Sequence, residues 1–181
     1  MAALRGGAPV SRSAAEGVLI TGVYGAGKSS VAAEICYLLD KRRRPHAFLD
    51  VDFLGWGVAD FRDDADEHEL TLINLAAVVA NYREAGIGVF VLAYFIEDAD
   101  VLRRVRDAAG MPLRVVRLTV PFQELRQRLA PDVTSGRQDD LRNAEVQLAE
   151  SQGVGLEDLV MANDRPIGTV AREIIGWLGW E

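Results

Sequence analysis

A glycine-rich stretch at residues 22–29 has the residue types and the spacing of a phosphate-binding loop. Its sequence, GVYGAGKS, matches each fixed position of the pattern G-x-x-x-x-G-K-[ST]. Glycines adopt backbone angles that a Cβ forbids, so successive N–H groups can turn inward and bind an anion. Lys28 would add a positive charge for the terminal phosphates, and the Ser29 hydroxyl would bind Mg²⁺. The alternative interpretation is an ordinary glycine-rich turn between a strand and a helix.

The residues on either side of this loop predict the strand and the helix that the motif requires. The apolar run at 17–21 predicts a short strand, and apolar residues at helical spacing predict a helix over 30–41. The positive end of that helix dipole would lie at the same anion site. We therefore expect phosphate contacts from the following residues: Gly22, Tyr24, Gly25, Ala26, Gly27, Lys28, Ser29 and Ser30.

Two carboxylates end the second predicted strand, at 46–52. Asp50 and Asp52 are spaced i, i+2, so on a strand they would lie on the same side at its carboxyl end. Ligands bind at that end in open α/β sheets. Asp52 could there accept a proton from a hydroxyl group or orient that hydroxyl. The structural alternative is that Asp52 caps the helix that follows.

Strand and helix patterns alternate along the rest of the chain. The apolar run 88–94 predicts a central strand covered on both faces, and further strands are expected at 113–120 and 158–162. Helices are expected at 70–84, 98–109, 122–129, 141–152 and 167–178, with the acidic residues 62–69 as a solvated loop and helix start. This alternation predicts an α/β three-layer sandwich with a five-stranded parallel sheet. We assign residues 1–16 to a flexible N-terminal tail and 17–181 to a single domain.

Composition limits the functional classes. The net charge of −7 argues against nucleic-acid binding by a basic face. No apolar run reaches the ~18 residues of a membrane span. The single cysteine, Cys36, excludes an internal disulfide and fits a reducing compartment. We therefore expect a cytoplasmic protein with neither a membrane nor a nucleic acid as partner.

In these features the chain resembles the P-loop small-molecule kinases, a group that includes adenylylsulfate, gluconate, shikimate and nucleoside-monophosphate kinases. The resemblance covers residues 17–178 and rests on four features in order: the loop at 22–29, the two aspartates, an arginine-bearing lid at about 126–142, and the sequence NDRP at 163–166. It implies ATP-dependent transfer of the γ-phosphoryl group to a hydroxyl of a small molecule, with ATP and Mg²⁺ as cofactors. The partner would be that acceptor. The chain would be a monomer or a homodimer, and an exposed end at Trp177 and Trp180 could pair with a second copy.

The resemblance also implies roles for individual residues. Lys28 would be catalytic, Ser29 and Asp50 would bind Mg²⁺, and Asp52 would act on the acceptor hydroxyl. Asn163, Arg165 and Pro166 would line the adenine pocket, a plain turn being the alternative.

Four arginines of the implied lid could neutralise charge that develops on the transferring group: Arg126, Arg128, Arg137 and Arg142. Arg137 is the preferred candidate, because it lies beside Gly136 in a flexible stretch and a closing loop could deliver it. Arg126 is also expected to contact the nucleotide, although Arg126 and Arg128 could be solvated helix positions.

The expected acceptor site departs from that of adenylylsulfate kinases. Residues 53–58 carry no charge where those enzymes have a basic group for an anionic substrate. We therefore expect a neutral or partly apolar acceptor, such as a metabolite or antibiotic, contacted by the following residues: Asp52, Phe53, Trp56, Arg62, Tyr94 and Phe95. The alternatives are adenylylsulfate kinase proper and an ATP-binding regulatory or ligand-sequestering protein without turnover. A GTPase is disfavoured, because no Asn/Thr-Lys-x-Asp stretch is present.

Overall fold

The structure is a computed structural model that describes residues 14–56, 64–129, 144–147 and 155–181, with residues 64–67 described for the backbone alone. Its elements are β1 (Glu16–Thr21), α1 (Lys28–Lys41), β2 (Ala47–Asp50), α2 (Asp52–Gly55), α3 (Asp64–Glu84), β3 (Val89–Ala93), α4 (Ala99–Ala109), β4 (Leu113–Thr119), α5 (Phe122–Leu129), β5 (Leu159–Ala162) and α7 (Ile167–Leu178). A further helical turn is described at 144–147.

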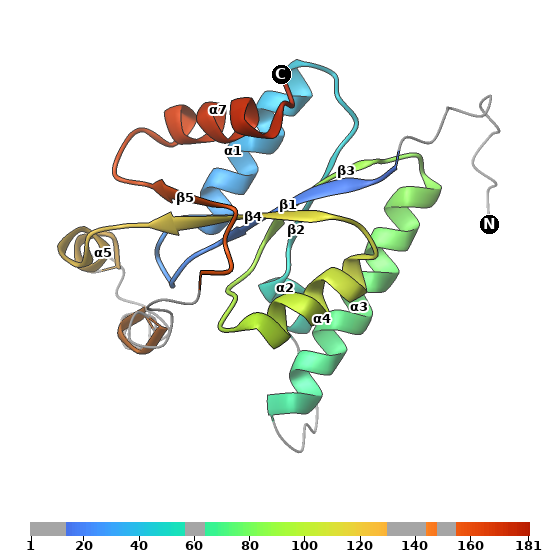
Figure 1. Cartoon of the computed structure of the whole chain (residues 1–181), viewed down its shortest axis with the longest axis horizontal. Coiled ribbons are helices and arrows are strands. Elements are labelled where there is room, and N and C mark those ends of the chain that lie inside the picture. Colours follow the sequence, from blue (N-terminus) through green and yellow to red (C-terminus); the bar gives the residue numbers. More distant parts are fainter. Residues whose placement is uncertain (1–13, 57–63, 130–143, 148–154) are drawn as a thin grey trace.

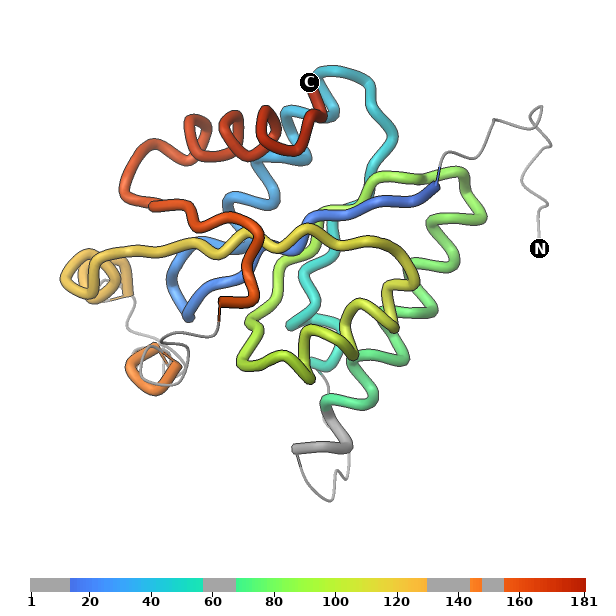
Figure 2. The backbone as a smooth tube through the Cα atoms, in the orientation of Figure 1, coloured from blue at the N-terminus to red at the C-terminus, as the bar shows by residue number. Residues whose placement is uncertain are grey.

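The five strands form one parallel sheet in the order β2-β3-β1-β4-β5, as the alternation in the sequence predicts. Helices α1 and α7 cover one face of the sheet and α3 and α4 cover the other (Figure 1). The three-layer sandwich expected from the sequence is therefore confirmed. Figure 2 shows that the bend between β1 and α1, helix α5 and the turn into α7 lie at the same end of the sheet.

Burial explains why the central strands and the C-terminal helix form. All five residues of β3 are buried, as are five of the six residues of β1, so these strands need apolar side chains on both faces. Each fully buried Val, Leu, Ile or Phe side chain among them contributes roughly 1.5–3 kcal/mol. Helix α7 buries one apolar stripe, and Trp180 behind it is 1 % exposed and donates from Nε1 to Glu16 at 3.1 Å. Trp180 therefore packs within the domain, whereas Trp177 on α7 is 36 % exposed.

Three boundaries differ from the sequence prediction. The second strand ends at Asp50, because Val51 adopts helical backbone angles and is the N-cap of the short helix α2. Helix α3 begins at Asp64, within the acidic stretch expected to be a solvated loop and helix start, and six residues before the start expected for the helix at 70–84. Acidic residues favour a helix N-terminus, where the dipole is positive, so the same charges are compatible with helix. Strand β1 begins at Glu16, one residue inside the expected tail.

Within the part of the chain that the structure describes, no helix combines the length and the apolar content needed to cross a membrane.

Candidate functional site

The loop at 22–29 joins β1 to α1 in the backbone conformation that its glycines permit. Gly22, Gly25 and Gly27 have φ angles of 141°, 76° and 91°, which residues with a side chain rarely adopt. Space is also limiting: a Cβ on Gly22 would lie 2.7 Å from the carbonyl oxygen of Leu118, and one on Gly27 would lie 2.6 Å from Asn163 Nδ2. Both the angles and the close contacts therefore require glycine at the fixed positions of the motif.

Lys28 is the first residue of α1 and is buried, with 7 % of its surface exposed. Its Nζ lies 5.8 Å from the centroid of the Tyr24 ring, which favours a cation. Burial lowers the pKa of Lys28, and the negative charges of Asp52 and Asp50 oppose that shift. A further anion beside Lys28, such as a bound phosphate, would stabilise the charged form of its ammonium group.

Asp50 and Asp52 both lie within electrostatic range of Lys28, although they are not on one strand. Asp50 is the last residue of β2 and Asp52 is the first residue of α2, so the expectation that both lie on one side of a strand is wrong. The capping alternative is also wrong, because Val51 is the N-cap and Asp52 is already within the helix. Asp52 is exposed by surface area, yet the surrounding protein raises its pKa by desolvation, with Lys28 opposing and Asp50 adding to the shift.

The chemistry of Asp50 and Ser29 fits a Mg²⁺ ion that is shared with a ligand. Oδ1 of Asp50 is buried and has no hydrogen-bond partner among the described residues. The described residues contain no group of three or more His, Cys, Asp or Glu side chains that could hold a metal by themselves. Mg²⁺ in nucleotide sites typically takes one or two protein carboxylates or hydroxyls, and phosphates and water supply the rest. Ser29 and Asp50 line the same cavity, as such an ion requires.

That cavity has a volume of about 600 Å³ and combines a few oxygen groups with an apolar wall. It is lined by Ser29, Ser30, Ala33, Phe48, Leu49, Asp50, Phe53 and Leu54. The ring of Phe53 stacks on that of Trp56, with centroids 5.4 Å apart, and the two residues are 61 % and 77 % exposed. An exposed, stacked aromatic pair beside a cavity is a surface to which an apolar or planar ligand can bind.

Several wall residues of the cavity were not among those selected from the sequence. Ala33 lies one helical turn beyond Ser29 and Ser30, and Phe48 lies two residues before Asp50 on β2. Helical and strand periodicity would therefore have identified both, had it been extended outward from the expected site residues.

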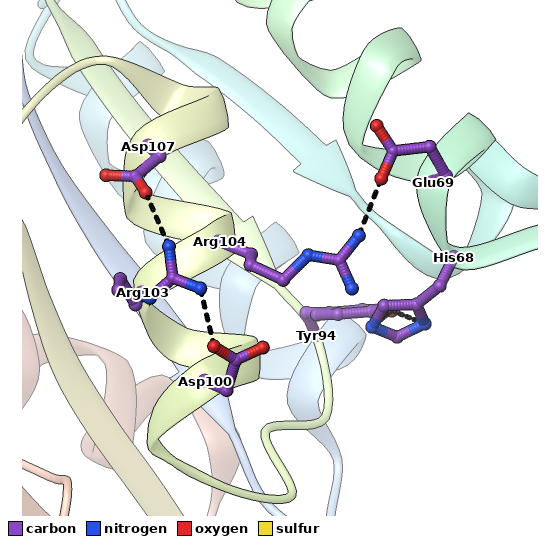
Figure 3. A network of polar contacts seen from close by, with 7 residues as sticks. All are labelled: His68, Glu69, Tyr94, Asp100, Arg103, Arg104 and Asp107. Atoms are coloured by element: carbon purple, nitrogen blue, oxygen red, sulfur yellow. Dashed lines mark hydrogen bonds and ion pairs between the residues drawn. The ribbon is translucent and has the colours of Figure 1, made fainter. Parts of the chain in front are cut away.

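The structure places Tyr94 and Phe95 away from this cavity, whose lining contains neither residue. Tyr94 follows β3, is 8 % exposed, and its hydroxyl lies 3.3 Å from Nδ1 of His68 on α3 (Figure 3). Helices α3 and α4 are joined in the same region by an ion pair of 2.6 Å between Glu69 and Arg104. Phe95 is partly buried against the core on the other face of the sheet. The proposed acceptor contacts of these two residues stay predictions, and the structure assigns both a packing role.

The loop after β5 meets the phosphate-binding loop directly. Asn163 is 1 % exposed and donates from Nδ2 to the carbonyl oxygen of Ala26 at 2.8 Å. Arg165 is bonded to Glu173 at 2.8 Å and 3.0 Å, and Pro166 is the N-cap of α7. Adenine contacts of these residues stay predictions. The side-chain nitrogen of Asn163 is bonded to the loop at Ala26.

The lid arginines are only partly described. Arg126 is exposed on α5, whereas Arg128 donates to the carbonyl oxygen of Asn163 and to Glu124. Arg62, Arg137 and Arg142 lie outside the described residues. Gln147, which sequence reasoning did not select, accepts a hydrogen bond of 2.7 Å from the amide N–H of Tyr24. No local pattern points to Gln147, because its partner lies 123 residues earlier in the chain.

No protein-family model matches this chain, and no curated protein matches it in sequence. Solved structures do. The Mycobacterium tuberculosis APS kinase, in complex with AMPPNP and APS, is 27 % identical and superposes with a TM-score of 0.63, covering 92 % of this chain and 98 % of its own. The Deinococcus radiodurans tunicamycin resistance protein (21 % identical, TM-score 0.66) covers 91 % of this chain and 96 % of its own. Shikimate kinase from Acinetobacter baumannii, in complex with shikimate (16 % identical, TM-score 0.59), covers 93 % of this chain and 95 % of its own.

These structures confirm the resemblance seen in the sequence at the level of the fold. A sugar kinase and a gluconokinase share the fold as well, so the neighbours are predominantly P-loop kinases of small molecules. They support a kinase-type function and leave the acceptor to be identified from the site.

Proposed function

We propose that this chain is an ATP-dependent kinase that transfers the γ-phosphoryl group to a hydroxyl of a neutral or partly apolar small molecule. The observation that carries the proposal is the arrangement around Lys28: a buried ammonium at the end of a glycine loop, within electrostatic range of Asp50 and Asp52. Phosphoryl transfer asks a protein mainly for positioning and charge stabilisation, which this arrangement supplies. The fold shared with solved small-molecule kinases supports the same conclusion.

The nucleotide side of the site consists of the loop amides, Lys28 and Ser29. The N–H groups of Tyr24, Gly25 and residues 27–30 would bind the phosphates, because the Ala26 N–H already donates to the carbonyl oxygen of Val23 at 3.0 Å. Lys28 would neutralise the terminal phosphates. Mg²⁺, when bound through Ser29 and Asp50, supplies charge neutralisation on the phosphate oxygens. The orphaned Oδ1 of Asp50 supports this assignment, because a buried carboxylate oxygen without a partner costs free energy unless a ligand satisfies it.

Asp52 is the group proposed to act on the acceptor. In the transfer, the acceptor oxygen forms a bond to the γ-phosphorus, the bond from that phosphorus to the bridging oxygen of ADP breaks, and the hydroxyl proton goes to the Asp52 carboxylate. A raised pKa makes Asp52 a better proton acceptor than an ordinary aspartate. Lys28 remains beside the departing phosphate and stabilises its charge.

The lining of the cavity supports a neutral or partly apolar acceptor. Ala33, Phe48, Leu49 and Leu54 form the apolar wall, and Phe53 and Trp56 extend it outward. No lysine or arginine lines the cavity among the described residues. We place this reaction in the cytoplasm, without a membrane or nucleic-acid partner, in a monomer or homodimer.

The test is a screen for ADP release with Mg·ATP and a panel of hydroxyl compounds. The panel includes gluconate, shikimate, APS, tunicamycin, aminoglycosides and apolar aromatic alcohols. We expect turnover with at least one neutral or apolar member, loss of that turnover in Asp52→Asn, and unchanged turnover in Asp107→Asn, an exposed aspartate on α4.

Three outcomes contradict the proposal. Slow ATP hydrolysis that no acceptor stimulates and that Asp52→Asn leaves unchanged would rule out kinase activity. Tight binding of a panel member without turnover, equal in both proteins, would show a ligand-sequestering protein instead. Turnover of APS alone would identify an adenylylsulfate kinase and overturn the neutral-acceptor class.

A further inference from the structure

Asn163, which follows β5, makes two hydrogen bonds of different kinds, one to the neighbouring strand β4 and one to the phosphate-binding loop. Its backbone N–H donates to the carbonyl oxygen of Thr119 at 2.9 Å, which continues the pairing between β4 and β5. Its side-chain Nδ2 donates to the carbonyl oxygen of Ala26 at 2.8 Å, across 137 residues of sequence. The rigid sheet therefore determines where the amide of Asn163 lies, and the amide in turn contacts the loop.

The orientation of that amide follows from chemistry. A carbonyl oxygen only accepts hydrogen bonds, so the nitrogen of Asn163 must face Ala26. The packing is tight, because a Cβ on Gly27 would lie 2.6 Å from this nitrogen. The other atom of the amide, Oδ1, is buried without a partner among the described residues. Leaving a buried acceptor unpaired costs folding free energy, so the residue is not optimised for stability alone.

A second element braces the same contact. Arg128 on α5 donates to the backbone carbonyl oxygen of Asn163 and to Glu124 one turn earlier. Helix α5 also touches the loop itself, since a Cβ on Gly25 would lie 3.1 Å from side-chain atoms of Leu125 and Leu129. The loop is thus held at Gly25 by α5 and at Ala26 by Asn163, and Arg128 ties these two supports together.

Because the peptide unit is planar, the hydrogen bond to the Ala26 carbonyl also fixes the direction of an N–H group at the anion site. The carbonyl of Ala26 and the N–H of Gly27 belong to one peptide unit, and in a trans peptide they point in opposite directions. A hydrogen bond that holds the carbonyl toward Asn163 therefore holds the Gly27 N–H on the opposite side. In a phosphate-binding loop, inward-pointing N–H groups make the contacts to the anion.

We propose that Asn163, braced by Arg128, is a positioning residue that aims the Gly27 N–H of the phosphate-binding loop at bound phosphate. This inference rests on the proposed nucleotide site, and it assigns Asn163 to the phosphates rather than to the adenine ring. The residue acts through the loop backbone, so it affects every ligand that carries the polyphosphate group, with or without a base.

Calorimetric titration with Mg·ATP and with magnesium tripolyphosphate separates the two roles. We expect Asn163→Ala to weaken both ligands by a similar factor of about tenfold, the loss associated with one misaligned hydrogen-bond donor. The matched control is Asn74→Ala, which deletes an equivalent bond of 2.7 Å from an asparagine amide to the carbonyl oxygen of Leu54. The control is expected to bind both ligands like the wild type.

A loss for ATP with unchanged tripolyphosphate binding would overturn the inference and show a base contact. Unchanged binding of both ligands would overturn it as well. If Asn163→Ala does not fold, Asn163→Leu, which keeps a similar side-chain volume, removes the donor and adds no charge, gives the same comparison. If wild type binds neither ligand, the proposed nucleotide site itself fails, which is a different outcome from a variant that binds normally.

A double-mutant cycle tests the brace. Arg128→Met is expected to weaken tripolyphosphate binding in the wild type and to add little in the Asn163→Ala background, because both act on one contact. Full additivity of the two losses would show that Arg128 contacts the phosphate independently.

Discussion

The side-chain Oε1 of Gln147 lies 2.7 Å from the amide nitrogen of Tyr24 and accepts its hydrogen bond. Tyr24 is the third residue of the phosphate-binding loop, so a distant segment of the chain contacts the loop in this structure. The segment is anchored there, because Ala144 in the same helical turn is fully buried in the core cluster beneath α1 and α7. A carbonyl oxygen and a phosphate oxygen would compete for the same donor.

A charged acceptor at position 147 should compete more strongly. Hydrogen bonds to carboxylates are roughly twice as strong as those to neutral amides, and a carboxylate also repels phosphate. We expect Gln147→Glu to weaken Mg·ATP binding about tenfold in a calorimetric titration. Val146→Glu, which adds the same charge at the adjacent, 49 % exposed position, should have a much smaller effect. Equal losses in the two variants would show that only long-range repulsion is at work.

Lys28 should be required for nucleotide binding, and its buried charge should lower the stability of the folded protein. We expect Lys28→Met to weaken Mg·ATP binding on the order of 100-fold, since each hydrogen bond to a charged group is worth roughly 1.5–3 kcal/mol. Its pKa is lowered by burial, so the charged form is held unfavourably in the folded state. The variant should therefore unfold at the same or a higher temperature, by about 2–4 °C for each kcal/mol regained.

Lys41 offers the matched control, because it is the only other lysine in the chain. It lies at the exposed end of α1, with Nζ 4.9 Å from the centroid of the Tyr37 ring. Lys41→Met should bind Mg·ATP normally. Retained binding in Lys28→Met would contradict the phosphate site.

The pH dependence of turnover should report on Asp52. The carboxylate must be unprotonated to accept the acceptor's proton, and desolvation by the surrounding protein raises its pKa above the usual value of 3.8. As the pH falls, Asp52 is therefore protonated earlier than an ordinary aspartate, and kcat/KM should decline with a midpoint above 3.8. The measurement is the pH profile of kcat/KM for the acceptor found in the screen, with circular dichroism to show that the protein stays folded. A midpoint at or below 3.8 in folded protein would be inconsistent with Asp52 as the base.

The stacked aromatic pair should affect the acceptor and nothing else. Phe53→Ala and Trp56→Ala are expected to raise KM for the acceptor about tenfold, since stacking and apolar contact are worth roughly 0.5–1.5 kcal/mol beyond the buried area. Mg·ATP binding and thermal stability should stay unchanged, because both residues are more than half exposed. Tyr37→Ala, at a 52 % exposed aromatic on α1, is the matched control. An unchanged KM in both cavity variants would place the acceptor elsewhere.

The sequence by itself determined the phosphate-binding loop, the fold class and the central strands. The loop is readable because its pattern consists of contiguous residues: glycines that allow positive φ, then Lys28 and Ser29 at the start of a helix. Strand β3 is readable because full burial on both faces demands an unbroken apolar run. The parallel sheet follows from alternation, since parallel neighbours need a crossover between them.

The tertiary structure alone decided how the site is supported and where its walls lie. Asn163 to Ala26 and Gln147 to Tyr24 are contacts across 137 and 123 residues, which no local pattern encodes. Asp52 lies outside β2 because the pairing of β2 with β3 ends at Asp50, opposite Ala93. Ala93 is the last residue of β3, so the neighbouring strand limits the length of β2. The lowered pKa of Lys28 depends on the protein packed around it. Composition and spacing specify which groups the chain carries, whereas burial and long-range contacts determine what surrounds each of them.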